Sequence, residues 1–267
     1  MKISACYMVR DEILTLPESI QKMRPLVDEI CVLDTGSTDG TKVYAKWAAD
    51  KYADFKWCDD FSAARNASLK LASNEWIFVI DADEYVDERY KNQIHALLHD
   101  DKVDAYSFQI FNFLSNPMWV LHPRIAYGKS IRLFRRSKGY KYEGIVHNRL
   151  NTEVSVEIPI CIYNFNYYEI NKLDFKTAQN KRLMDQKVKQ QGWNFLNCVH
   201  YGDIYRKLWT WRRNPEDGFE AIKHFEHAIQ FNPDSHIQEV IDSINEEIAK
   251  YYEQKNNVAG QAQAFQG

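Results

Sequence analysis

Three carboxylates that could hold a metal ion follow a run of five apolar residues. Residues 76–80 are all apolar, which predicts a strand buried on both faces, and Asp81, Asp83 and Glu84 come directly after it. Such an acidic cluster costs free energy unless a cation pairs with it, and ligands bind at this end of the strands in open α/β sheets. Mg2+ or Mn2+ holding a diphosphate would supply the charge, because both ions prefer oxygen ligands. A strand that ends in a solvated acidic turn is the alternative interpretation of this motif.

Strands and helices alternate in the part of the chain that leads up to this cluster. Apolar runs predict strands at 2–9, 29–33, 54–58 and 76–80, separated by helical patterns at 14–23, 41–52 and 61–73. This alternation predicts an α/β fold with a mostly parallel central sheet and right-handed crossovers. Arg10 and Glu12 follow the first strand. Asp34 follows the second and opens a polar turn that contains Gly36.

Further strands are predicted after the acidic cluster. Residues 88–99 predict a helix, and residues 105–114, 131–135 and 154–162 predict strands. The segment 115–129 contains two prolines and a glycine, which predicts a loop over the site. The basic and aromatic stretch that follows contains the isolated His147.

Polar, charged helices are predicted from about residue 171 onwards. Gly202, Tyr205, Ala221 and Phe225 occur in the order of a tetratricopeptide repeat. One such unit cannot bury its apolar face alone, so we expect it to pack on the rest of the chain or on a second copy, as a homodimer. The predicted domains are a catalytic domain at 1–168, a helical extension at 169–255 and a disordered tail at 256–267.

Composition excludes several classes of partner. The net charge of −3 gives no electrostatic footprint for nucleic acid or for a membrane surface, and no apolar run is long enough to span a membrane. The five cysteines are scattered without metal-ligand spacing, which is typical of a reducing compartment. With no signal peptide recognisable at the start of the chain, we expect a cytoplasmic protein.

Four blocks of the sequence, taken together, resemble a known family. They are ACYMVRDE at 5–12, VLDTGSTDGT at 32–41, DFSAARNASL at 60–69 and WIFVIDADE at 76–84. In this order and spacing they resemble the family 2 glycosyltransferases, which have the GT-A fold, over about residues 1–150. The later YEGIVH segment and the helical tail are similar to two subgroups of that family. One glucosylates lipopolysaccharide core, and the other places sugars on bacteriocin peptides.

The resemblance implies a hexosyltransferase with a nucleotide-sugar donor, usually a UDP-sugar, and a Mn2+ or Mg2+ ion. The implied acceptor is a glycan, a glycolipid or a peptide. Residues at the carboxyl ends of the strands would contact the nucleotide-sugar: Tyr7 and Val9 through the strand-end backbone, and Arg10, Glu12, Asp34, Gly36, Arg65, Asp81 and Ala82. Within this set Asp34 would accept hydrogen bonds from the uracil or ribose, and Arg65 would face the diphosphate. Asp83 would bind the metal directly, and Asp81 would contact either the ribose or the metal. His147 would be a late metal ligand or a phosphate contact.

The general base of an inverting transfer is the least specific assignment. Glu143 is the candidate, with Asp87 and Glu88 as further carboxylates, and related sequences often have a glutamate where this chain has Asn148. Structural interpretations remain open: Asp34 as a turn residue, Arg65 as a solvated helix charge, and His147 and Glu143 as residues without a role in chemistry.

Two other classes of function compete with an active transferase. A catalytically inactive GT-A domain could act as an adaptor that binds a partner through its helical tail, although the intact acidic cluster argues against it. A nucleotidyltransferase would share a nucleotide-binding sheet, but no glycine-rich triphosphate loop follows the first strand.

Overall fold

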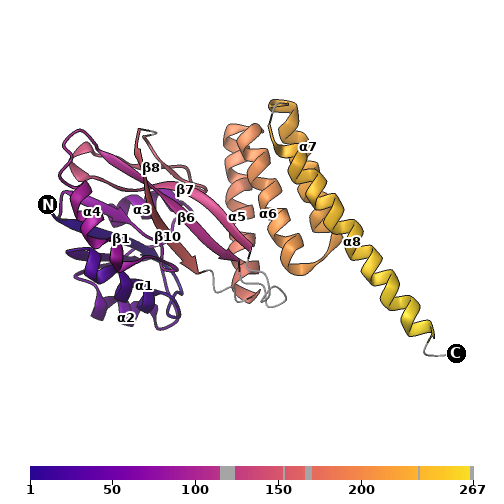
Figure 1. Cartoon of the computed structure of the whole chain (residues 1–267), viewed down its shortest axis with the longest axis horizontal. Helices are drawn as coiled ribbons and strands as arrows, with labels where there is room; N and C mark the ends of the chain where they lie inside the picture. The colour runs from indigo at the N-terminus through magenta and orange to yellow at the C-terminus, as the bar shows by residue number, and fades with distance from the viewer. Residues whose placement is uncertain (115–123, 153, 166–169, 234, 265–267) are drawn as a thin grey trace. The chain divides into compact units, whose positions relative to one another are not determined.

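The computed structural model of the chain consists of two compact units, Met1–Tyr168 and Glu169–Gly267. It describes residues 1–114, 124–152, 154–165, 170–233 and 235–264. The first unit is an α/β domain and the second is entirely helical (Figure 1). The predicted combination of an α/β domain and a helical extension is therefore confirmed.

The first unit alternates strands and helices as far as the acidic cluster. Its elements up to that point are β1 (Ile3–Val9), α1 (Leu16–Met23), η1 (Arg24–Leu26), β2 (Glu29–Asp34), α2 (Thr41–Ala48), β3 (Lys51–Asp54), α3 (Phe61–Leu69) and β4 (Trp76–Val79). The remaining ones are β5 (Glu84–Val86), η2 (Glu88–Tyr90), α4 (Lys91–Leu97), β6 (Ala105–Leu114), β7 (Arg124–Arg135), η4 (Arg136–Lys138), β8 (Tyr142–Glu143), β9 (Arg149–Leu150) and β10 (Val156–Phe165).

The central sheet is parallel where the sequence predicts it to be and mixed beyond. Its strand order is β3-β2-β1-β4-β7-β6-β10-β5. The pairs among β3, β2, β1 and β4 are parallel, so the carboxyl ends of these strands share one edge. β7 is antiparallel to both β4 and β6. Asp34 and the end of β4 therefore lie on the same edge, separated by β1.

The sheet curls around the acidic cluster. β5 begins five residues after the end of β4 in the sequence, at Glu84, yet it pairs with β10 at the far end of the strand order. Five strands, β4-β7-β6-β10-β5, therefore enclose the turn between β4 and β5. This enclosure buries Glu84, of which only 2% is exposed.

Helices cover the two faces of the sheet with separate apolar clusters. On one face α1, α2 and α4 pack through residues such as Leu16, Ala45 and Ile94 against the inward side chains of β1. On the other face Leu69 at the end of α3 packs with Tyr142 and Leu150 of the β8–β9 hairpin. α3 and the hairpin are thus held on the same side of the sheet, and both approach the end of β4.

Several predicted boundaries are wrong, because pairing between distant segments overrides local pattern. α2 ends at Ala48 and β3 occupies Lys51–Asp54 instead of 54–58, since Asp50 binds the backbone of Ile30 and starts the pairing earlier. The predicted loop at 115–129 is a strand from Arg124 onwards, paired with β6 despite Gly128. Its part at 115–123 lies outside the described residues. The short strands β5, β8 and β9 were not predicted.

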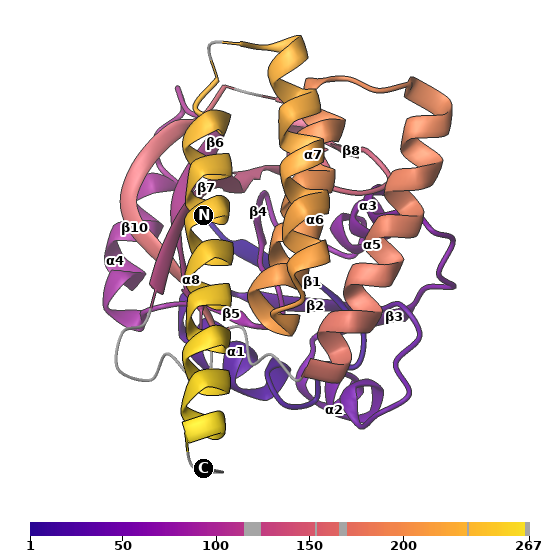
Figure 2. The ribbon, with the colours of Figure 1, turned by 90° about the vertical axis from the view of Figure 1, so that its right-hand side faces the viewer.

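The second unit is a stack of helices. They are α5 (Ile170–Gln191), α6 (Phe195–Arg212), α7 (Pro215–Phe231) and α8 (Ile237–Ala264), with α6, α7 and α8 packed in succession (Figure 2). Their shared core includes Trp209, Phe225 and Ile241. α8 continues as far as Ala264, through most of the tail that we expected to be disordered. Among the described helices none is both long and apolar enough to cross a membrane.

Gly202 on α6 leaves no room for a side chain beside Phe225 of α7, which gives a stability prediction. A Cβ atom at position 202 would lie 2.6 Å from the ring of Phe225, which is 2% exposed and cannot move away. We expect Gly202→Ala to lower the free energy of unfolding by about 1–2 kcal/mol, because overpacking costs about 1–3 kcal/mol and the better helix propensity of alanine returns less than about 1 kcal/mol.

Thermal denaturation of Gly202→Ala measures this effect. Gly128→Ala is the control, because a Cβ there meets nothing closer than 3.9 Å. An unchanged melting temperature for Gly202→Ala would show that α6 and α7 are not packed this closely.

Candidate active site

The acidic cluster forms a tight turn at the end of β4. The Glu84 backbone N–H donates to the Asp81 carbonyl at 3.0 Å, and the Asp81 backbone N–H donates to the Glu84 carboxylate at 3.0 Å. These two bonds fix the backbone of the four residues. Asp83 lies at the third position of the turn and is partly exposed, whereas the Ala82 side chain is buried.

Two arginines neutralise the carboxylates beside Asp83. Arg65 on α3 donates to one Asp81 oxygen at 3.0 Å, and Arg132 on β7 contacts the other at 3.5 Å. Arg132 also donates to Glu84 at 2.8 Å. These pairs supply the positive charge that the buried strand end requires. Arg65 is therefore not a solvated helix charge, since its side chain is only 13% exposed.

A β-bulge points Arg132 at this cluster. The pairing of β6 with β7 shifts between Tyr106 and Ser107, which face Leu133 and Ile131, so Arg132 is the extra residue. Bulges next to active sites commonly redirect one side chain in this way. Because Arg132 is buried and pairs with two carboxylates, it is the central cation of the cluster.

Burial and charge shift the pKa values of the two carboxylates in opposite directions. Burial alone would raise the pKa of Asp81, but the guanidinium charges of Arg65 and Arg132 outweigh it and hold that pKa well below its ordinary value. Burial raises the pKa of Glu84, which the charge of Arg132 opposes and the charge of Asp81 increases. Asp81 is therefore a stable anion, and Glu84 depends on Arg132 to remain one.

Helix α3 positions both Arg65 and the hairpin that follows β7. Asp60 caps the helix by accepting from the Ala63 N–H at 3.0 Å. The Asn66 side chain then binds the backbone of Tyr142 twice, donating to its carbonyl and accepting from its N–H, both at 2.8 Å. The Arg65 guanidinium lies 5.2 Å from the centre of the Tyr142 ring. The DFSAARNASL block thus joins the acidic cluster to the hairpin.

Asp34 has one satisfied and one unsatisfied carboxylate oxygen. Oδ1 accepts from the backbone N–H groups of Gly36 and Ser37, both at 2.8 Å. Oδ2 is buried and has no hydrogen-bond partner among the described residues. An unsatisfied buried oxygen costs free energy, and an N–H or O–H donor of a ligand would satisfy it. Because Asp34 is fully buried, a ligand reaches Oδ2 only after the residues that cover it move.

The loop that follows β1 is fastened to the Asp34 turn. The Asp11 carboxylate accepts from the backbone N–H of Thr38 at 2.6 Å, and the Glu12 N–H donates to Thr41 at 2.7 Å. Asp11 has a positive φ of 53° and Gly36 one of 109°. Gly36 is required at its position, because side chains other than glycine strain there. Arg10 and Glu12 thus lie in the same pair of loops as Asp34.

The side chains of Tyr7 and Val9 point into the core, so only their backbone could make the predicted contact with the donor. Tyr7 is fully buried and its hydroxyl is 3.0 Å from that of Ser19, and Val9 is 1% exposed. Inward positions of a parallel strand alternate with period two, so both side chains point into the core. The Val9 carbonyl is also occupied, by the Thr35 N–H at 2.9 Å. The Ala82 side chain belongs to the same apolar cluster.

The residues present fit a metal ion that a diphosphate helps to hold. Within the described part of the chain no three His, Cys, Asp or Glu side chains form a metal-binding group, so the side chains of Asp81, Asp83 and His147 are not gathered into one there. Asp81 is engaged by two arginines, and Asp83 is the partly exposed carboxylate at the apex of the turn. Mg2+ is commonly bound by one or two carboxylates and substrate phosphates, and Asp83 suits that arrangement.

Glu143 and His147 belong to the β8–β9 hairpin. Glu143 is exposed and faces Arg149 across the two strands. His147 is exposed with a positive φ of 50°, and Gly144 has one of 102°. The binding of Tyr142 by Asn66 fixes the backbone next to Glu143, so this carboxylate projects from an anchored strand.

Sequence reasoning missed Arg132 and Asn66. The signal for Arg132 was the acidic cluster itself, since three carboxylates at a buried strand end require more than the single cation Arg65. Which arginine of β7 would serve depends on the bulge, which has no local sequence signature. Asn66 lies in a recognised block, but its partner is 76 residues away.

Comparisons with known proteins point to one family. Residues 3–163, more than half of the chain, match the sequence model described as Glycosyl transferase family 2. The chain is 34% identical over 146 residues to the TPR repeat-containing protein Synpcc7942_0270 of Synechococcus elongatus, which covers 55% of this chain and 34% of that protein. It is 26% identical over 197 residues to the glycosyltransferase SunS of Bacillus phage SPbeta, covering 70% of this chain and 45% of that protein.

The chain thus spans less than half of the length of either relative. Among solved structures, it is similar to S. aureus TarS 1-349 in complex with UDP-GlcNAc, with a TM-score of 0.45 and 11% identity over 98% of this chain and 92% of that one.

Proposed function

The chain belongs to glycosyl transferase family 2, and on this premise we propose that it is an inverting hexosyltransferase that uses a nucleotide-sugar, with UDP as the carrier. The acceptor is a glycan, a glycolipid or a peptide. The observation that carries the proposal is the turn at Asp81–Glu84, which holds Asp83 at its apex between carboxylates that two arginines neutralise. Such a preorganised site suits a leaving diphosphate.

Residues on the shared strand edge would hold the donor. The unsatisfied Asp34 oxygen would accept the imide N–H of uracil, and the adjoining loops with Arg10 and Glu12 would border the base. Arg65 and Asp81 would position the ribose and diphosphate at the end of β4. Asp83 would hold Mn2+ or Mg2+, which supplies positive charge to the diphosphate as its bond to the sugar breaks.

Glu143 would act as the general base. Its carboxylate would take the proton of the acceptor hydroxyl or thiol while that nucleophile bonds to the anomeric carbon. The nucleoside diphosphate leaves from the opposite face of the sugar with the bonding electron pair, so that configuration inverts. A carboxylate on an anchored strand supports this role.

Release of the nucleoside diphosphate from a panel of nucleotide-sugars, with Mn2+, Mg2+ or EDTA, tests the proposal. We expect slow, metal-dependent hydrolysis of one UDP-sugar without acceptor. If no donor releases its diphosphate and none binds, the proposal is wrong and the adaptor hypothesis replaces it.

Asp34→Asn is expected to weaken UDP binding by roughly 10- to 100-fold. The substitution keeps an oxygen for the Gly36 and Ser37 N–H groups but removes the anion that would accept from uracil, and a hydrogen bond to a charged group contributes about 1.5–3 kcal/mol. Calorimetric titration with UDP measures the loss. Equal affinity in both proteins would leave Asp34 with a structural role only.

Glu143→Gln is expected to slow transfer by about a hundredfold, at the lower end of the range for general bases, because water can reach this exposed position. Donor affinity should not change. Single-turnover kinetics with a transferable acceptor separates these quantities, and full activity would eliminate Glu143 as the base.

A further inference from the structure

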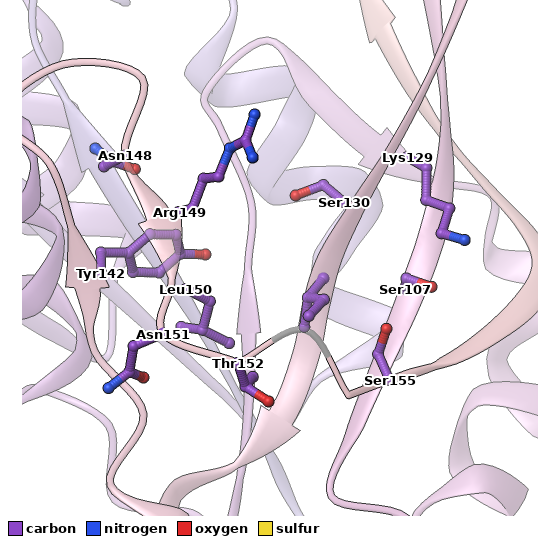
Figure 3. A pocket seen from close by; sticks show the side chains of 11 residues that line it. Ser107, Lys129, Ser130, Tyr142, Asn148, Arg149, Leu150, Asn151, Thr152 and Ser155 are labelled. Atoms are coloured by element: carbon purple, nitrogen blue, oxygen red, sulfur yellow. The ribbon is translucent and has the colours of Figure 1, made fainter. Parts of the chain in front are cut away.

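A polar pocket of about 780 Å3 lies between the β8–β9 hairpin and strands β6 and β7. Figure 3 shows the side chains that line it. Tyr142 and Arg149 come from the hairpin, and Ser107, Lys129 and Ser130 come from the two strands. The Tyr142 hydroxyl points from the hairpin toward the strands (Figure 3). The pocket is lined entirely by residues of the first unit.

Tyr142 is a wall shared by this pocket and the acidic cluster. Its ring contacts the guanidinium of Arg65, which binds Asp81 at 3.0 Å, while its hydroxyl end lines the pocket. Ile131 of the pocket directly precedes Arg132, the second arginine on Asp81. The pocket is thus one side chain away from the proposed diphosphate site, and the proposed base Glu143 follows Tyr142 in the same strand.

Two hydroxyls of buried residues in the pocket have no hydrogen-bond partner in the part of the chain that the structure describes. Ser107 is 1% exposed and its Oγ makes no hydrogen bond. No hydrogen bond engages the Tyr142 hydroxyl within the described part of the chain either, although only 8% of this residue is exposed. Unsatisfied polar groups inside a pocket are typical of a site that completes its hydrogen bonds with a ligand.

The described residues that line the pocket carry positive charge. None of these is acidic, whereas two are cations. Lys129 pairs with Glu157 at 2.8 Å, outside the lining. Arg149 pairs with no carboxylate among the described residues, although Glu143 faces it across the hairpin. The guanidinium of Arg149 is therefore the group with charge to offer a ligand.

We propose that this pocket is the acceptor site and that it takes a polyhydroxylated acceptor bearing a phosphate or carboxylate group. The anion would bind Arg149, whose planar fork suits both groups. The hydroxyls of the acceptor would bind Ser107 and Tyr142. This assignment rests on the proposed transferase function, because it places the acceptor across Tyr142 from the donor.

Binding of three simple probes to the full chain tests the proposal: glucose, glucose 6-phosphate and glucuronate, titrated by calorimetry. We expect at least one of the two anionic sugars to bind about tenfold or more tightly than glucose. The more tightly bound of the two identifies the anion as phosphate or carboxylate. Arg149→Ala should abolish this preference, and the control Arg89→Ala should retain it, because Arg89 is an exposed arginine of the same unit outside the pocket.

Ser107→Ala separates recognition from folding. It removes a buried hydroxyl that has no partner, so thermal stability should not fall, whereas the affinity for all three sugars should fall severalfold. Equal binding of the three probes by the wild type, no binding of any, or a preference that survives Arg149→Ala would each overturn the proposal. UDP affinity, measured on the same proteins, should be the same in Arg149→Ala. If the wild type does not bind UDP, the transferase function is contradicted, whereas the preference for anionic sugars is not.

Discussion

Asp83→Ala is expected to reduce metal-dependent release of UDP by about a thousandfold or more. Removing electrostatic stabilisation of a leaving group costs several kcal/mol, and Asp83 is the carboxylate at the apex of the turn, between Asp81 and Glu84, which arginines neutralise. Because Asp83 is partly exposed, its removal should not change the melting temperature. Initial rates with Mn2+ over a range of concentrations measure the effect.

The matched control for this variant is Asp101→Ala. Asp101 is 85% exposed and lies before β6, at the opposite edge of the sheet from the acidic turn, so activity should be retained. If the wild type turns over in excess EDTA, or if Asp83→Ala retains its Mn2+ dependence, Asp83 does not hold the metal.

Arg132→Met is expected to lower the free energy of unfolding by about 3–5 kcal/mol at neutral pH. Glu84 is 2% exposed and receives its 2.8 Å ion pair from Arg132. Methionine fills similar volume but leaves the Glu84 carboxylate buried without a cation, and breaking a buried pair costs this much. Urea denaturation measures the loss.

The loss should depend on pH in a defined direction. Burial already raises the pKa of Glu84, against the charge of Arg132, so removing Arg132 raises this pKa further. A group with a raised pKa in the folded state keeps its stability below its unfolded pKa and loses it as pH rises through the folded value. The loss of stability in Arg132→Met should therefore be smaller near pH 4, about the pKa of an unfolded glutamate, than near pH 8.

A second substitution isolates the charge effect. In Arg132→Met/Glu84→Gln no buried carboxylate remains at this position, so most of the stability lost at pH 8 should return. If the double variant is as unstable as the single one, or if the loss does not vary with pH, Arg132 contributes through packing and not through Glu84.

Local pattern predicted the parts of the fold whose contacts are close in sequence. The apolar runs that became β1, β2 and β4 are buried strands, and their parallel order follows from the helices between them. The Asp81–Glu84 turn and the Asp34 turn could be placed at one sheet edge for the same reason. The family resemblance then gave the residues of this edge their expected roles.

Long-range pairing set the features that local pattern could not predict. Arg132 reaches the acidic cluster because of a bulge in β7. β5 pairs with β10, which lies about 80 residues later in the sequence, as in the pair Glu84 and Asn164. Tyr7 and Val9 lie at a strand end, and their phase in the strand points both side chains into the core, so the contact predicted for their backbone stays a prediction. A one-residue difference in phase decides which side chains face the core.

Calorimetric titration of the full chain with UDP, in Mn2+ and in EDTA, tests the central claim most directly. The claim is that the shared edge of β1, β2 and β4 binds a uridine diphosphate whose charge is balanced by a metal ion that Asp83 holds. We predict binding with Mn2+ that weakens strongly in EDTA and in Asp34→Asn. Absence of UDP binding with Mn2+, or binding that neither EDTA nor Asp34→Asn changes, would contradict it.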